Sequence, residues 1–243
     1  MIKIENLTIS FGDKMVLKRI NLNIPKNSVF GFIGKNGAGK TTTMKAILGL
    51  LIPNEGNVIV NGEKVVFGGT STNKYIGYLP DVPEFYTFMT AYEFLKFCAE
   101  LTDLSKDLIK ARVEEMLKLV GLENETHQIK GFSRGMKQRL GIAQALLHKP
   151  KILLCDEPTS ALDPIAESEM YQKYNEISKK ATSVFISHRL ASTKFCNRIL
   201  LIQDSIIKEI GSHDELIKLD GEYKKLFDVQ SKYYKEDYNN EEE

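Results

Sequence analysis

Residues 34–41 read Gly-Lys-Asn-Gly-Ala-Gly-Lys-Thr. This stretch lies between residues 28–33, an apolar run typical of a strand buried on both faces, and residues 41–50, where apolar residues have helical spacing. Glycines let backbone N–H groups approach a phosphate with no Cβ in the way, and the N-terminus of the following helix attracts an anion. The order of strand, glycine-rich loop and helix therefore predicts an α/β fold that binds a nucleoside triphosphate.

The loop also supplies the candidate ligands of ATP. We expect Lys40 to contact the β- and γ-phosphates, and the Thr41 hydroxyl to ligate Mg²⁺. Further contacts to the nucleotide are expected from Gly34, Lys35, Asn36, Gly37, Ala38, Gly39 and Thr42.

Two adjacent carboxylates follow a second apolar strand in the later half of the chain. Residues 152–157 read Ile-Leu-Leu-Cys-Asp-Glu. We expect Asp156 to hold Mg²⁺ through water, and Glu157 to polarise or orient the water that attacks in an in-line phosphoryl transfer. The pair therefore predicts ATP hydrolysis in addition to ATP binding.

The composition excludes several other classes of protein. The 243 residues are 42% apolar, which allows a substantial core, and 33 basic against 32 acidic residues give a net charge of +1. No global field therefore draws the chain to nucleic acid or acidic membranes. Three widely spaced cysteines argue against a disulfide framework or a zinc site and favour a reducing cytosol. No run of 18 apolar residues occurs, so we expect a second polypeptide to supply any membrane-spanning part.

The periodicity of apolar residues predicts the order of elements. Strands are expected over residues 2–9, 17–24, 75–79, 151–155 and 182–187, and strand pairs over 57–67 and 198–210. Helices are expected over 91–101, 108–120, 135–148 and near 166–179, with two short ones near the C-terminus and a frayed tail from residue 231. We interpret residues 1–234 as one domain, with an α/β core (1–89 and 150–234), a helical subdomain (90–149) and an acidic tail (235–243).

Residues 132–140, Phe-Ser-Arg-Gly-Met-Lys-Gln-Arg-Leu, resemble the signature motif of ATP-binding cassette (ABC) proteins, usually Leu-Ser-Gly-Gly-Gln-x-Gln-Arg. Physically, Ser133 is expected to cap a helix whose N-terminus, with the Gly135 amide, faces a γ-phosphate. The resemblance implies that two such domains pack head to tail, with ATP held between the P-loop of one domain and the signature of its partner. The residues expected to act in trans are Ser133, Arg134, Gly135 and Met136.

Other stretches resemble further landmarks of the family. Residues 160–163 look like the D-loop, which places Asp163 at the dimer interface, and His188 resembles the switch histidine that senses the γ-phosphate. Phe11 stands where the family has an aromatic that stacks on adenine. The resemblance extends to about residue 234. It implies a P-loop NTPase fold of the ABC ATPase type, with a RecA-like core, an antiparallel β subdomain and an inserted helical subdomain.

Three positions depart from the family pattern. Asp81 replaces the Q-loop glutamine and is expected to lie near the metal, while Arg134 and Met136 replace a glycine and a glutamine of the signature. Up to about residue 164 the chain resembles ATPases found with bacterial drug, peptide-antibiotic and bacteriocin-immunity exporters (the ABC-2 type). The remainder resembles the ATPase domains of half-exporters. Natural mosaicism and an engineered origin both stay open.

The resemblance implies a Mg²⁺-dependent ATPase subunit of an ABC transporter, more specifically of an exporter, bound peripherally at the cytoplasmic face of the cell membrane. Its implied partners are an integral-membrane transport subunit and, as a homodimer or a heterodimer, a second ABC ATPase domain. The alternative is a non-transport ABC ATPase that acts on nucleic acid or ribosomes. DNA-repair members insert a long coiled coil between P-loop and signature, and translation factors carry two cassettes. Neither feature occurs here, so no nucleic-acid partner is expected. Phe85, Tyr86 and Phe88 are open as a docking patch for the membrane subunit or as core residues.

Overall fold

The computed structural model describes residues 1–159, 181–187 and 190–239, and it builds the chain around two β-sheets. The first sheet is antiparallel, with the strand order β2-β1-β4-β5. Its strands are β1 (Ile2–Phe11), β2 (Lys14–Ile24), β4 (Glu55–Val60) and β5 (Glu63–Lys64). Asn61 and Gly62 both have positive φ, 52° and 87°, as a two-residue hairpin turn requires. The predicted hairpin is confirmed, but its return strand ends at Lys64 and not at residue 67.

The second sheet has the strand order β10-β9-β3-β8-β7-β6. Strands β6 to β9 and β3 run parallel, and β10 is antiparallel at the edge. The strands are β3 (Val29–Ile33), β6 (Ile76–Leu79), β7 (Ile152–Asp156), β8 (Thr182–Ile186), β9 (Arg198–Gln203) and β10 (Ile206–Gly211). All residues of β7 and β8 are buried, which explains their nearly unbroken apolar sequences.

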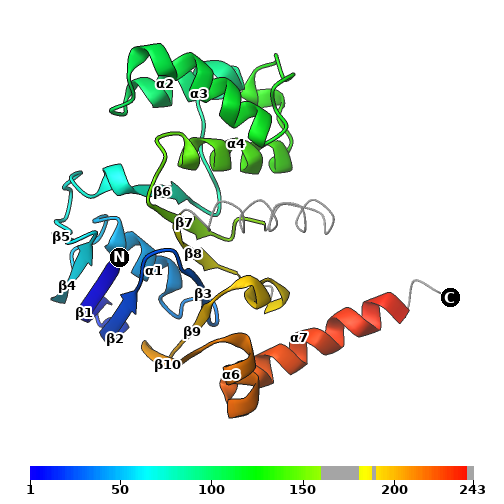
Figure 1. Ribbon diagram of the computed structural model, residues 1–243. Coiled ribbons are helices and arrows are strands. Elements are labelled where there is room, and N and C mark those ends of the chain that lie inside the picture. The colour runs from blue at the N-terminus through cyan, green and yellow to red at the C-terminus, as the bar shows by residue number, and fades with distance from the viewer. Residues whose placement is uncertain (160–180, 188–189, 240–243) are drawn as a thin grey trace.

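Three helices stand above the sheets in Figure 1 and share a hydrophobic core with the upper strands. They are α2 (Ala91–Glu100), α3 (Lys106–Leu119) and α4 (Arg134–Leu146), close to the helices that the sequence predicts. A capping box starts α2, because the Thr90 hydroxyl accepts from the Glu93 N–H while the Glu93 carboxylate accepts from the Thr90 N–H. The division into core and helical subdomain stays an interpretation.

Helix α4 is fixed to β6 by a very close backbone approach. A Cβ added to Gly77 of β6 would lie 2.1 Å from the carbonyl oxygen of Ala145. On the other side of the contact, a Cβ on Gly141 of α4 would lie 2.7 Å from Leu79. Only glycine therefore lets the helix and the strand come this near, and the second half of α4 is positioned by that contact.

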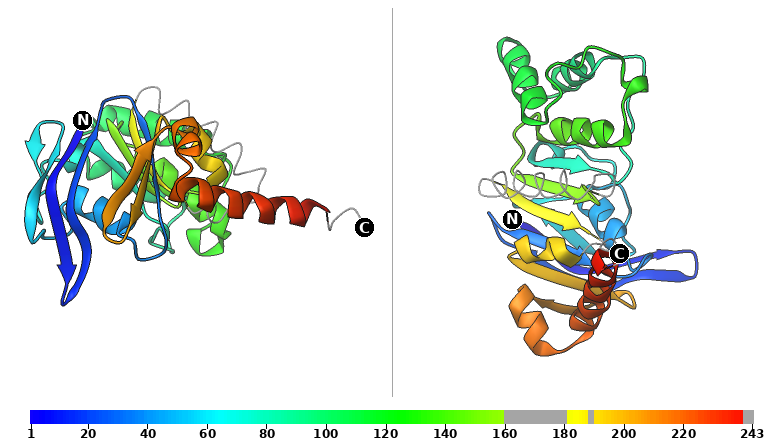
Figure 2. Two further views of the ribbon diagram at one scale, coloured as in Figure 1. Left: turned by 90° about the horizontal axis from the view of Figure 1, so that it is seen from below. Right: turned by 90° about the vertical axis from the view of Figure 1, so that its right-hand side faces the viewer.

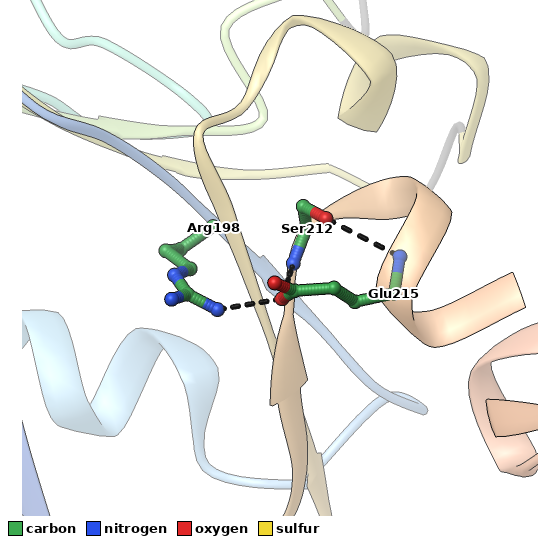
Figure 3. A network of polar contacts seen from close by, with 3 residues as sticks. All are labelled: Arg198, Ser212 and Glu215. Atoms are coloured by element: carbon green, nitrogen blue, oxygen red, sulfur yellow. Dashed lines mark hydrogen bonds and ion pairs between the residues drawn. The ribbon is translucent and has the colours of Figure 1, made fainter. Parts of the chain in front are cut away.

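The C-terminal region begins with a second capping box, drawn in Figure 3. Helix α6 (His213–Leu219) starts where the Glu215 N–H donates to the Ser212 hydroxyl at 3.2 Å and the Ser212 N–H donates to the Glu215 carboxylate at 2.9 Å. Arg198, at the start of β9, donates to the same carboxylate at 2.7 Å. The contact ties the edge of the parallel sheet to α6.

The last helix differs from its prediction. Helix α7 (Glu222–Asn239) is 18 residues long and extends away from the sheets, as Figures 1 and 2 show, where the sequence predicts a short helix and a tail frayed from residue 231. The carboxylate of Glu209 accepts from the N–H groups of Glu222 and Tyr223, so the first turn is capped, and no Gly or Pro follows Gly221 to end the helix. The helix predicted near 166–179 lies outside the described residues. None of the described helices is both long and apolar enough to cross a bilayer.

Candidate nucleotide-binding and hydrolysis site

The glycine-rich loop connects β3 to α1 (Lys40–Ile47) and has a backbone that side chains would not tolerate. Gly34 has φ 149°, and a Cβ there would lie 2.2 Å from the carbonyl oxygen of Ile202. Gly39 has φ 104°, and a Cβ there would lie 2.5 Å from Leu17 of β2. The loop is therefore held between the parallel sheet and the antiparallel sheet. The first N–H groups of α1 have no partner within the helix and point out of its N-terminus.

Lys40, the first residue of α1, is turned back over this loop. Its Nζ donates to the carbonyl oxygens of Gly34 at 2.7 Å and Lys35 at 3.1 Å, and the residue is only 5% exposed. Burial lowers the pKa of the ammonium, while Glu157 and Asp156 oppose the shift. The charge of Lys40 is thus desolvated and rigidly placed, which strengthens its attraction for a phosphate.

A cavity of about 340 Å³ opens beside the loop, within the range of small-ligand sites. Predicted residues line most of it: Phe11, Asn36, Gly37, Gly39, Lys40, Thr41, Thr42 and Glu157. Gly34, Lys35 and Ala38 belong to the loop but do not line the cavity. Phe11 is 53% exposed at the end of β1, as a ring that receives a flat ligand would be. The cavity thus joins an exposed aromatic to a phosphate-binding loop.

Asp156 ends β7 close to Thr41. It is 4% exposed and accepts a hydrogen bond from the Thr41 hydroxyl. Burial raises its pKa, and the neighbouring Glu157 and Asp81 carboxylates add to that rise. A cation at this place would relieve the repulsion, and hydroxyl and carboxylate oxygens are the donors that Mg²⁺ prefers. Within the described residues no cluster of three or more His, Cys, Asp or Glu is placed to hold a metal ion.

Asp81 follows β6, on the same edge of the sheet. Its charge adds to the rise in the pKa of Asp156, and burial followed by the charges of Asp156 and Asp81 raises the pKa of Tyr78 to about 12. The expected place of Asp81 near a metal ion stays a proposal.

Glu157 has an unusual backbone. Its φ is +51°, a left-handed conformation that is costly for a residue with a side chain, and its N–H donates to the carbonyl oxygen of Ile186 in β8 at 3.1 Å. This conformation turns the chain sharply at the end of β7, and Glu157 reaches the cavity while Asp156 stays buried. Strained residues of this kind concentrate at functional sites.

The predicted signature residues lie at the start of α4. The Ser133 hydroxyl accepts from the Met136 N–H at 3.2 Å, so Ser133 is the predicted N-cap. Ser133 and Arg134 are exposed, and Gly135 and Met136 are half-buried. None of these four residues lines the cavity beside the P-loop. The other two predicted residues, Asp163 and His188, lie outside the described residues.

The family follows from comparison with known proteins. A family model described as ABC transporter matches residues 17–160, which is more than half of the chain. The chain belongs to the ABC transporter family of ATP-binding proteins. The predicted fold class and the predicted assignment as an ATPase are both confirmed.

Relatives of this ABC ATPase include bacterial transporter subunits. The uncharacterized ABC transporter ATP-binding protein YxlF of Bacillus subtilis is 41% identical, over 89% of this chain and 72% of its own length. The bacitracin transport ATP-binding protein BcrA of Bacillus licheniformis is 37% identical, over 92% of this chain and 73% of its own. A solved dimeric ATP-binding cassette in a post-hydrolysis state, bound to ADP and Pi, is 27% identical with a TM-score of 0.79, over 87% of this chain and 98% of that one. The predicted mosaic of two subfamilies stays an interpretation.

Sequence reasoning missed two residues of this ABC ATPase site. Lys14 and Val16, at the start of β2, also line the cavity. Both precede the strand predicted over residues 17–24, since β2 begins three residues earlier, and only the packing of the antiparallel sheet beside the loop brings them to the cavity. Lys14 is exposed and adds a second positive charge to the site.

Proposed function

We propose that this ABC ATPase binds Mg-ATP in the cavity beside residues 34–41 and hydrolyses it with Glu157 as the residue that polarises or orients the attacking water. The observation that carries the proposal is the convergence of Phe11, Lys40, Thr41 and Glu157 on one cavity from three separate parts of the fold, namely the end of β1, the start of α1 and the end of β7. A plain glycine-rich turn would bring no aromatic, cation and carboxylate together.

Each group has a separate task in this proposal. The loop N–H groups and Lys40 bind the phosphates, and Phe11 stacks on the adenine. Thr41 and Asp156 would hold Mg²⁺, with Asp81 close by, and the ion would supply positive charge against the β- and γ-phosphates. Glu157 acts on the water from the open side of the cavity. The sensing role of His188 rests on its resemblance alone.

The site is completed by a second ABC ATPase domain. The signature residues 133–136 are absent from the cavity of their own chain, and their exposed helix start is free to face a phosphate held by another domain. The related dimeric cassette bound to ADP and Pi supports a dimer as the working unit. Asp163 would then lie at the interface. The second domain is a copy of this chain or a different ABC ATPase.

The whole complex is proposed to be an exporter at the cytoplasmic face of the cell membrane, driven through an integral-membrane subunit. The name of the relative BcrA, a bacitracin transport ATP-binding protein, supports a role in transport. The three residues considered for a docking patch, Phe85, Tyr86 and Phe88, differ in how far they are exposed. Phe85 packs edge-on against Phe94, with ring centroids 5.1 Å apart, whereas Tyr86 and Phe88 are exposed, Phe88 by 66%. We assign docking to Tyr86 and Phe88, and packing to Phe85.

Two substitutions test the ATPase assignment. Glu157→Gln removes the carboxylate and keeps the shape, so hydrolysis should fall at least about a hundredfold while ATP still binds. Lys40→Ala should weaken ATP binding itself, measured by direct titration. Unchanged steady-state turnover in Glu157→Gln would refute the role of Glu157, and wild-type ATP affinity in Lys40→Ala would refute that of Lys40.

A further inference from the structure

A buried side chain of α4 reaches the backbone next to Glu157. Gln138 is only 2% exposed, and its Nε2 donates to the carbonyl oxygen of Pro158 at 3.2 Å. Pro158 is buried as well, and it directly follows Glu157. Burying a side-chain amide costs free energy unless the amide is hydrogen-bonded. The hydrogen bond of Gln138 meets this need and joins two segments that are 20 residues apart.

The backbone that receives this bond is held in an unfavourable conformation. Glu157 is left-handed, with φ +51°, and it precedes a proline, which restricts the backbone further. On the N-terminal side its N–H is fixed by the carbonyl oxygen of Ile186 at 3.1 Å. On the C-terminal side, Gln138 holds the carbonyl of the next residue. One bond therefore comes from β8 and one from α4, and together they oppose relaxation of the turn.

Helix α4 also carries the signature residues at its start. Ser133 caps the helix, and Gln138 lies five positions further along the same continuous helix of 13 residues. Any tilt or shift of the helix start therefore moves the Gln138 amide too, because a helix of this length is nearly rigid. Through its hydrogen bond, the Gln138 amide would transmit that movement to the Pro158 carbonyl, which lies next to Glu157 in the chain.

We infer that Gln138 is a positioning residue that couples the signature helix of one domain to the hydrolytic carboxylate of the same domain. When the start of α4 engages the nucleotide of a second domain, the bond from Gln138 to Pro158 sets the position of Glu157 at the nucleotide of its own domain. The two ATP sites of a dimer thereby sense each other. This inference rests on the proposed function, because it assumes that Glu157 acts on the water and that the signature acts in trans.

The test uses Gln138→Met, which keeps the length of the side chain and removes the donor. A small misplacement of a catalytic group reduces turnover by up to about a hundredfold, so kcat should fall between about ten- and a hundredfold. The Kd for ATP should stay within about twofold, because the loop at residues 34–41 is untouched. Gln144→Met on the same helix is the matched control, and its kcat should equal that of the wild type.

A second variant, Gln138→Glu, separates positioning from simple packing. A protonated carboxyl donates to the Pro158 carbonyl, whereas an ionised one repels it, and burial favours the protonated form. The kcat of Gln138→Glu relative to wild type should therefore rise as the pH falls from 8 to 6, and that ratio is readable even if Gln138→Met folds poorly.

The outcomes are distinct from those of the proposed function. If wild-type turnover depends on Glu157 but Gln138→Met matches Gln144→Met and Gln138→Glu shows no change of ratio with pH, the coupling is wrong and the ATPase assignment stands. If Glu157→Gln turns over ATP like the wild type, the proposed function itself fails.

Discussion

At the residue scale, the site brings together opposite charges, each of which would be unfavourable to bury alone. Lys40 is buried with its pKa lowered, and the Asp156 carboxyl is buried with its pKa raised. Each partly compensates the other, and Glu157 opposes the pKa shift of Lys40 while it adds to that of Asp156. A triphosphate with its metal ion brings a negative charge to Lys40 and a positive one to Asp156. The site therefore favours that ligand over a neutral one.

Lys14 is expected to contribute to nucleotide affinity. It is an exposed cation on the wall of the cavity, so its attraction for a triphosphate is worth up to about 1 kcal/mol. Lys14→Ala should weaken ATP binding up to about fivefold in a titration at low salt, and the difference should shrink as salt is added. Lys18→Ala, an exposed lysine on the same strand but off the cavity wall, is the control. Equal affinities in the two variants would contradict this role.

His148 should make the fold sensitive to acid. Burial lowers its pKa below the ordinary 6.5, its ring bonds the Ile76 carbonyl oxygen at 3.1 Å, and Arg112 disfavours a second charge nearby. Below pH 6.5 His148 therefore binds a proton more readily in the unfolded chain than in the folded one. The contribution of His148 to the free energy of unfolding is full above pH 6.5 and is lost as the pH falls below it. The loss is at most about 1.4 kcal/mol per pH unit.

The measurement is urea unfolding between pH 7.5 and 5.5. His148→Gln keeps a donor for Ile76 but does not titrate, so its free energy of unfolding should fall less over this range than that of the wild type. His127→Gln removes an exposed histidine and should keep the wild-type dependence. An unchanged slope in His148→Gln would show that another group causes the acid loss.

At the element scale, the glycines between α4 and β6 set the height of the helical layer above the sheet. Gly77→Ala places a methyl group 2.1 Å from the Ala145 carbonyl oxygen, so α4 must move or the strand must bend. Overpacking of this kind costs about 1–3 kcal/mol of unfolding free energy, measurable by urea denaturation. Gly131→Ala is a suitable control, since the nearest atom to its new methyl is 4.0 Å away. Equal stabilities of the two variants would contradict the close contact.

Most elements follow from the sequence, because apolar runs such as that of β7 and caps such as Thr90 or Ser133 act locally. The same holds for Lys40, Thr41, Asp156 and Glu157, which stand at fixed offsets from a strand end or a helix start. Features that depend on contacts between distant segments could not be predicted from the sequence. Lys14 reaches the cavity only through the packing of one sheet beside the other, and the first turn of α7 is capped by Glu209 of β10, which is distant in the sequence.

At the scale of the whole molecule, the fold separates two anion-binding helix starts. The start of α1 faces the cavity, and the start of α4 carries exposed signature residues outside it. Under the proposed function a single chain holds one half of each of two sites, and the hydrogen bond from Gln138 to Pro158 links the two segments within it. Movement of a membrane subunit would follow from closing and opening such a pair.

The central claim is that the ATP site is shared between two domains. The most direct test is the mass of Glu157→Gln in solution with Mg²⁺ and ATP, measured by light scattering. We predict twice the mass of one chain with ATP and a single-chain mass without it. Adding Ser133→Arg should return the protein to one chain while ATP binding, measured separately, persists. A single-chain mass for saturated Glu157→Gln, or a dimer that survives Ser133→Arg, would contradict the shared site.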